Sequence, residues 1–146
     1  MLTNSAMVHI KSQTYQGSDQ DEIIEILAPG TLKLTEGKAI LEYEEALEED
    51  THPQKVTITV DSEGVDVERM GPYAMKLCFQ EKHRYQGIYQ TPFGGFDVAI
   101  FCTELQYDIN EDGGEIHICY QLDMNGEFAS MHEVHYKIIA GMSDDD

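Results

Sequence analysis

Apolar and polar residues alternate along most of the chain, and this period of two predicts β-strands. The clearest example is KVTITVDSEGVDVERMG, in which the alternation continues on both sides of DSEG. A four-residue loop at 61–64 makes the two apolar faces coincide. The predicted hairpin pairs Val60 with Val65 and Ile58 with Val67.

A second hairpin is predicted around the dipeptide Asn125-Gly126. A two-residue turn there scrambles the apolar faces, whereas a three-residue loop that begins at Met124 matches them. We therefore predict the longer loop with a bulge. The resulting pairs are Leu122 with Phe128, Tyr120 with Ser130, Ile118 with His132, and Ile116 with Val134.

Five further segments alternate in the same way, and turn residues separate them. The strands are residues 7–15, 21–28, 73–79, 83–91 and 96–109, and the turns are APG, MGPY, TPFGG and NEDGG. Residues 38–50 fit a helix by composition. They also fit a strand in which Leu41, Tyr43 and Leu47 share a face with Glu45. Because the surrounding segments are strands, we predict a strand.

Many consecutive antiparallel strands with tight turns predict an all-β fold. Closing the meander into a barrel removes long exposed edges. We therefore predict a single closed antiparallel barrel of about 8–10 strands. The barrel is one domain over residues 1–146, with an ordered core at about 7–140 and an acidic tail at 141–146. A barrel of this size either fills its interior with side chains or holds one small ligand.

The order of VTITVDSEGVDVERMGPY, YQTPFGGFDVAIFCTELQYD and GEIHICYQLDMNGEFASMHEVHYKI resembles the YwiB-like family of uncharacterised bacterial β-barrel proteins. The resemblance extends from about residue 8 to residue 138. Its most specific parts are R-x-G at residues 69–71 and Y-x-T-P-F-G at residues 89–94. It implies a bacterial barrel similar to the lipocalin-like calycins, and it supplies no catalytic residue.

Composition narrows the range of partners. The chain of 146 residues has 9 basic and 28 acidic residues and a net charge of −19, which repels nucleic acid and anionic membranes. It lacks an N-terminal signal-peptide pattern and any apolar run near the roughly 20 residues of a membrane helix. The three cysteines, Cys78, Cys102 and Cys119, lack CxxC spacing, which favours reduced thiols in the cytoplasm over a disulfide framework or a zinc site.

Arg69 is the first candidate for binding a ligand. The first hairpin's register places it beside Val56, facing the barrel interior or its mouth. A buried guanidinium needs an acceptor, which Glu42, Glu44 or Glu45 can supply. Arg69 then either closes the barrel through an ion pair or anchors an anionic small molecule.

Four tyrosines are the other candidates: Tyr43, Tyr85, Tyr89 and Tyr120. Tyr85 and Tyr89 share a strand face, and Gly87 between them leaves room for a neighbouring chain or a ligand. Tyr43 and Tyr120 lie on the apolar faces of their own strands. These rings either pack in the core or line a pocket beside Arg69.

Two patterns resemble metal sites, and we interpret both structurally. Residues 108–119 match the start of a calcium loop, but the twelfth position is Cys119 instead of Glu, so a β-turn is favoured. The outer face of the second hairpin sets His117 against Glu133 and Glu115 against His135. We interpret these as surface charge pairs instead of a zinc site. We predict no metal and no cofactor.

The chain contains no G-x-S-x-G, P-loop, H-E-x-x-H or G-x-G-x-x-G motif. The leading hypothesis is a cytoplasmic barrel that binds a small molecule in its interior. The alternative is a non-catalytic structural or interaction module with a filled barrel, which forms a homodimer or binds a basic partner through an acidic face or a strand edge. An interior cavity above roughly 300 Å³ would favour ligand binding.

Overall fold

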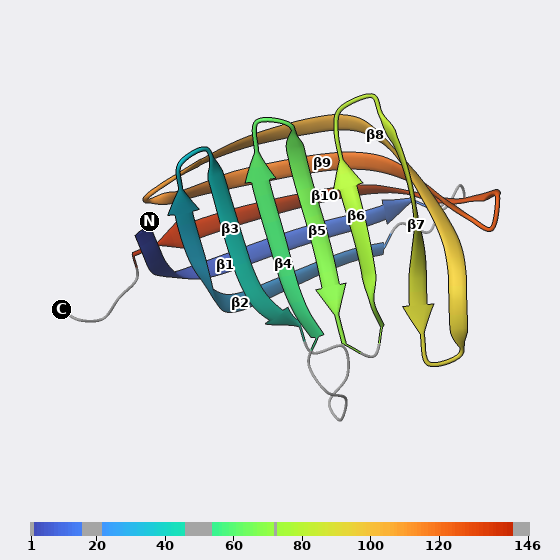
Figure 1. The fold of residues 1–146 in the computed structure, drawn as a ribbon, viewed down its shortest axis with the longest axis horizontal. Coiled ribbons are helices and arrows are strands. Elements are labelled where there is room, and N and C mark those ends of the chain that lie inside the picture. The colour runs from blue at the N-terminus through green and yellow to red at the C-terminus, as the bar shows by residue number, and fades with distance from the viewer. Residues whose placement is uncertain (1, 16–21, 46–53, 72, 142–146) are drawn as a thin grey trace.

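The structure is a computed structural model that describes residues 2–15, 22–45, 54–71 and 73–141. These residues form ten antiparallel strands in one sheet and contain no helix (Figure 1). The strands are β1 (Leu2–Tyr15), β2 (Glu22–Thr35), β3 (Lys38–Glu45), β4 (Gln54–Asp61), β5 (Gly64–Met70), β6 (Met75–Phe79), β7 (Arg84–Thr91), β8 (Gly94–Asn110), β9 (Gly113–Met124) and β10 (Glu127–Ala140).

The two ends of the chain meet in the middle of the sheet, whose order is β6-β5-β4-β3-β2-β1-β10-β9-β8-β7. β1 pairs with β10 from Ala6↔Ala140 to Tyr15↔Met131. The two outer strands, β6 and β7, are neighbours in sequence and approach each other through the bridge Ala74↔Gln90. The result is a nearly closed ten-stranded barrel, which confirms the predicted fold class.

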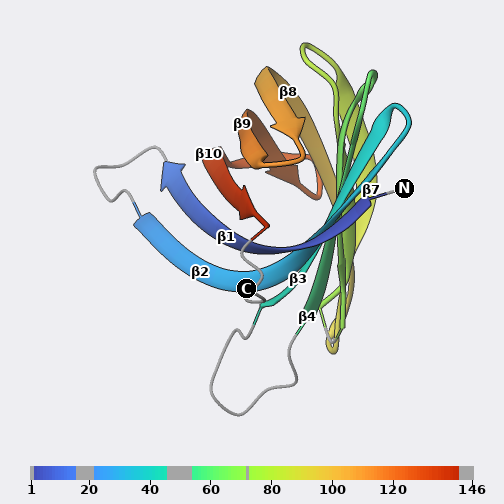
Figure 2. The same ribbon diagram turned by 90° about the vertical axis from the view of Figure 1, so that its left-hand side faces the viewer.

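The sheet curls into two layers. Strands β3–β6 cross in front of β1, β9 and β10 at a steep angle, and Figure 2 shows the curvature from the side. Side chains from both layers meet in the interior because alternate residues of each strand point inward. The largest fully buried residues are Leu32, Leu41, Ile58, Ile100, Ile116, Ile118, Val8, Val56, Val65 and Cys102.

The first hairpin forms in the predicted register, with Val60 opposite Val65 and Ile58 opposite Val67. Residues 38–45 of the ambiguous segment are a strand, β3, which pairs with β2 and β4. The rest of that segment, including Leu47, lies outside the described residues, as do residues 142–146 of the acidic tail.

The predicted register of the second hairpin is wrong by two residues. Asn125 and Gly126 form a two-residue turn, with positive φ angles of 51° and 86° that suit a tight hairpin. The extra residue is instead a β-bulge between Phe128 and Ser130. Like a longer loop, a bulge adds one residue to the strand and so brings the apolar faces of the two strands back onto the same side. The observed pairs are Leu122↔Ser130, Tyr120↔His132, Ile118↔Val134 and Ile116↔Tyr136.

The predicted turn at APG is also wrong, because β2 continues through it from Glu22 to Thr35. β2 pairs with β3 only from Gly30 onward. At Pro29, the side of β2 that faces β3 therefore has no partner strand among the described residues. An edge tolerates proline because the missing N–H breaks no ladder bond. The turns at TPFGG and NEDGG are confirmed: β8 begins at Gly94 and β9 at Gly113.

Gly114, at the start of β9, provides a test of this packing. Its φ is +150°, and a Cβ there would overlap the backbone carbonyl oxygen of Asp108. We expect Gly114→Ala to lower the free energy of unfolding by about 3 kcal/mol, because backbone strain and overlap combine. Urea denaturation measures this loss.

The matched control is Gly37→Ala. Gly37 has a φ of +78°, and a Cβ added there would have no neighbour within 4 Å, so its replacement costs only the backbone term of about 1 kcal/mol. Equal losses in the two variants would contradict the close approach at Gly114.

Candidate functional site

A cavity of about 440 Å³ lies between the two layers. This volume is within the range of about 300–1,000 Å³ of small-molecule sites. Ile24 of β2 lines it and is 46% exposed, so the cavity reaches solvent beside that strand. The apolar wall consists of Ile10, Ile24, Ile26, Val67, Leu77, Phe79, Ile118 and Val134; the polar wall consists of Ser12, Glu45, Arg69, Tyr120 and Tyr136.

An ion pair between Arg69 and Glu45 forms part of this wall. Arg69 Nε donates to Glu45 Oε1 at 3.2 Å, and Nη2 donates to Oε2 at 3.4 Å. The Glu45 side chain is 7% exposed and that of Arg69 is 30% exposed. Burial lowers the pKa of Arg69, but the Glu45 carboxylate together with Tyr136 and Tyr43 outweighs it and raises the pKa, so the guanidinium stays charged.

Strand alternation explains why Glu45 is the partner among the three predicted candidates. Along β3, Leu41, Tyr43 and Glu45 are buried, whereas Glu44 is exposed. Arg69 lies opposite Val56 of the intervening strand β4, and Tyr43 lies opposite Val56 on the other side. The guanidinium therefore reaches diagonally across the small side chain of Val56 to the end of β3.

Two tyrosine hydroxyls lie in the field of this ion pair. Burial raises the pKa of Tyr136 and of Tyr120, and the positive charge of Arg69 opposes the rise in both. Both hydroxyls are therefore protonated at neutral pH and can donate hydrogen bonds to a ligand. Tyr43 is buried in the core instead of lining the cavity; burial, followed by Tyr136, raises its pKa.

Tyr85 and Tyr89 of β7 pack against the core outside the cavity wall. A Cβ at Gly87 would lie 3.1 Å from the Tyr85 ring, so that ring occupies the space beside the glycine. Tyr89 packs on Tyr73 with ring centroids 6.2 Å apart. Burial and then Tyr73 raise the pKa of Tyr89, and the positive charge of Arg69 opposes this rise. Arg69 of the R-x-G motif therefore acts electrostatically on Tyr89 of the Y-x-T-P-F-G motif.

The structure thus places two of the five predicted residues, Arg69 and Tyr120, on the cavity wall. Sequence reasoning missed Tyr136 and Ser12. The sequence does indicate the position of Tyr136: it lies two residues after Val134, so alternation along β10 points its side chain inward. The predicted pairs of inward-facing residues ended at Val134 and left Tyr136 out.

His132 supports Tyr120 from β10. The two rings stack with centroids 4.8 Å apart. The histidine Nε2 lies 2.6 Å from Ser130 Oγ, and Nδ1 lies 3.3 Å from Thr14 Oγ1. Burial lowers the pKa of His132, which favours the neutral ring. His132 is therefore a satisfied, partly buried histidine, opposite Tyr120 instead of the predicted Ile118.

The fold and the cavity define a small all-β barrel protein with a partly polar interior. The chain belongs to the family described as domain of unknown function (DUF1934), whose match covers residues 8–136. It is 27% identical over 127 residues to the uncharacterized beta-barrel protein YwiB of Bacillus subtilis (strain 168), covering 87% of each chain.

The crystal structure of the ywiB protein from Bacillus subtilis has the same fold, with a TM-score of 0.84 and 24% identity. The similarity covers 95% of this chain and 93% of that one. These comparisons confirm the YwiB-like resemblance. Among the described residues, no helix is long and apolar enough to span a membrane.

The unequal burial of the two ionic partners predicts unequal effects of removing them. Arg69→Met leaves Glu45 as a buried, unpaired carboxylate, and we expect it to lower the free energy of unfolding by about 3 kcal/mol or more. Glu45→Gln leaves the more exposed Arg69, and we expect a loss of about 1–2 kcal/mol. Urea denaturation at neutral pH measures both. A larger loss in Glu45→Gln would contradict this account.

The partly buried His132 predicts a pH dependence of stability. Its folded pKa lies below the unfolded value of about 6.5, so the unfolded chain binds the proton first as the pH falls. The stability that the neutral ring provides is therefore present above about pH 6.5 and lost below it. We expect His132→Gln to lose less stability than the unmodified protein between about pH 7.5 and 5.5.

Thermal unfolding across this interval provides the measurement. The exposed residue His83, replaced by Gln, is the control, and this variant should keep the pH profile of the unmodified protein. A His132→Gln profile parallel to that of the unmodified protein would rule out this role.

Proposed function

We propose that this protein binds a small, largely apolar molecule that carries a hydrogen-bond-accepting group, such as a carboxylate, inside the barrel. The observation that carries the proposal is the cavity of about 440 Å³, whose wall combines eight apolar side chains with a polar group around Arg69. Ligand pockets typically have this composition of apolar walls and few polar groups. The alternative is a barrel that binds no ligand and acts as a non-catalytic structural or interaction module.

The polar part of the wall is rich in donors. Ser12, Tyr120 and Tyr136 contribute hydroxyls, and Arg69 contributes a charged guanidinium. The two oxygens of Glu45 already accept hydrogen bonds from Arg69. A bound molecule therefore meets more donors than free acceptors, which favours a carboxylate or carbonyl over an amine.

The wall supports binding over catalysis. Among the described residues that line the cavity, none is a histidine, cysteine or lysine, and its one carboxylate, Glu45, is held by Arg69. Ser12 and the two tyrosines have no free carboxylate or histidine on the described wall to take a proton from them, as nucleophilic and acid–base catalysis requires. The apolar wall instead suits transport, storage or sensing of a ligand.

Competition binding with a fluorescent apolar anion, 8-anilinonaphthalene-1-sulfonate, tests the proposal. We expect decanoate to displace this probe and to bind at least about tenfold more tightly than decylamine, a difference of about 1.4 kcal/mol. Val134→Trp fills the cavity and should weaken decanoate binding by at least about tenfold.

The matched control is Ile139→Trp, which adds the same ring at a position of β10 that is 47% exposed and lies outside the cavity wall. This variant should bind decanoate as the unmodified protein does. Decanoate affinity unchanged by Val134→Trp would overturn the interior site, and equal affinity for decylamine would overturn the preference for an acceptor.

A further inference from the structure

The outer face of β8, β9 and β10 carries chemistry that the cavity does not use. Alternation along β9 puts Cys119 and His117 among its outward-facing positions, opposite in direction to the buried Ile116 and Ile118. The register sets Glu104 of β8 and Glu133 of β10 directly opposite Cys119, one on each side. A thiol, an imidazole and two carboxylates from three strands therefore meet on one face.

A β-bulge in β8 places Glu104 in this group. The register shifts between Cys102, opposite Tyr120, and Glu104, opposite Cys119, so Thr103 is the extra residue. Without the bulge, Thr103 would stand opposite Cys119. Thr103 Oγ1 instead donates to the Cys119 carbonyl oxygen at 3.1 Å, which holds the bulge against β9. Bulges commonly redirect a side chain in this way.

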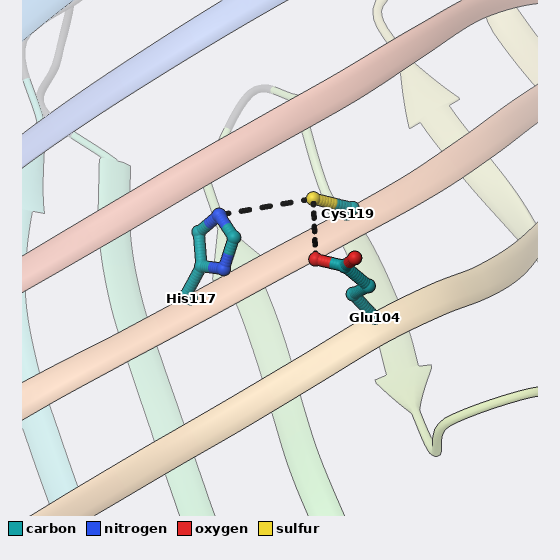
Figure 3. Close-up of side chains that lie close together, drawn as sticks. All are labelled: Glu104, His117 and Cys119. Atoms are coloured by element: carbon teal, nitrogen blue, oxygen red, sulfur yellow. Dashed lines mark hydrogen bonds between the residues drawn. The ribbon is translucent and has the colours of Figure 1, made fainter.

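The three donor atoms have the spacing of ligands around one ion (Figure 3). Cys119 Sγ lies 3.7 Å from His117 Nε2 and 3.8 Å from Glu104 Oε1, and all three atoms lie within 4.8 Å of one another. With zinc bond lengths of about 2.0–2.3 Å and tetrahedral angles, the nitrogen and sulfur ligands of zinc lie roughly 3.6 Å apart. An ion fits among them with little rearrangement.

Glu133 is a candidate for a fourth donor, but its carboxylate lies outside the group of three atoms that fall within 4.8 Å of one another, so its side chain must move to join them. Its Oε2 lies 2.7 Å from His117 Nε2, the same nitrogen that faces Cys119. The position of Cys119 between two carboxylates also favours a cation there. A cation would neutralise this local negative charge.

We propose that Glu104, His117, Cys119 and Glu133 form a zinc site that links β8, β9 and β10. A mixed set of sulfur, nitrogen and oxygen donors suits Zn²⁺, whereas Ca²⁺ and Mg²⁺ prefer oxygen ligands alone. The site is on the outer face, so it is independent of ligand binding inside the barrel. The sequence interpretation paired His117 with Glu133 and lacked Cys119 and Glu104, which the register and the bulge add.

Calorimetric titration of the full chain with zinc sulfate, after treatment with a chelator and reductant, tests the site. We expect saturable binding of one ion per chain in the presence of excess Mg²⁺, which occupies weak sites on the acidic surface. Cys119→Ser and His117→Gln should each lower the zinc affinity by at least about tenfold, because even the loss of an outer-shell partner of a ligand costs about 10–100-fold. Cobalt(II) should show a thiolate charge-transfer absorption that Cys119→Ser abolishes.

Two control variants keep the same residue types outside the cluster. Cys78→Ser and His83→Gln should bind zinc as the unmodified protein does. Because the conservative Cys119→Ser change alters one atom on a half-buried surface position, its circular dichroism should match that of the unmodified protein. Its decanoate affinity should be unchanged.

The absence of saturable zinc binding would overturn the proposal, and so would a zinc affinity that neither Cys119→Ser nor His117→Gln changes. Cobalt(II) binding without the thiolate absorption would exclude Cys119 as a ligand and would likewise overturn this ligand set. None of these three failures affects the interior site, because decanoate binding is measured separately.

Discussion

The alternation of residues in a curled sheet is the constraint on which the structure depends. Each strand sends every second side chain into the barrel and the others to solvent. The inward set supplies the apolar core, and also Arg69, Glu45, Tyr120 and Tyr136 around the cavity. The outward set supplies the mixed group around Cys119. The same alternation thus separates an interior suited to an apolar ligand from an exterior suited to a cation.

Much of this arrangement follows from the sequence because alternation is a local signal. The register of Val60 with Val65 and the inward position of Arg69 come directly from matching apolar faces. Residues 38–45 have a helix-forming composition, yet they form a strand because they pair with the strands on both sides. Here tertiary context outweighs intrinsic propensity.

The features that could not be predicted from the sequence are the β-bulges, which change the pairing register between neighbouring strands. A bulge before Ser130 and a three-residue loop at Met124 both restore the matching of faces, yet they differ by two residues in every pair that follows. The bulge at Thr103 leaves no distinct pattern in the sequence, although it alone brings Glu104 to Cys119. Neither the identity of the neighbours of Tyr120 nor the proposed zinc ligand set could therefore be predicted.

The central claim is that the interior beside Arg69 binds a small apolar molecule with an accepting group. Methyl NMR of the protein titrated with decanoate tests it most directly. The account predicts saturable shifts of the Ile118, Leu77 and Val67 methyl signals, which line the cavity, and none at Ile139 on the outer surface. Shifts confined to outward-facing methyls, or no shifts at all, would contradict it.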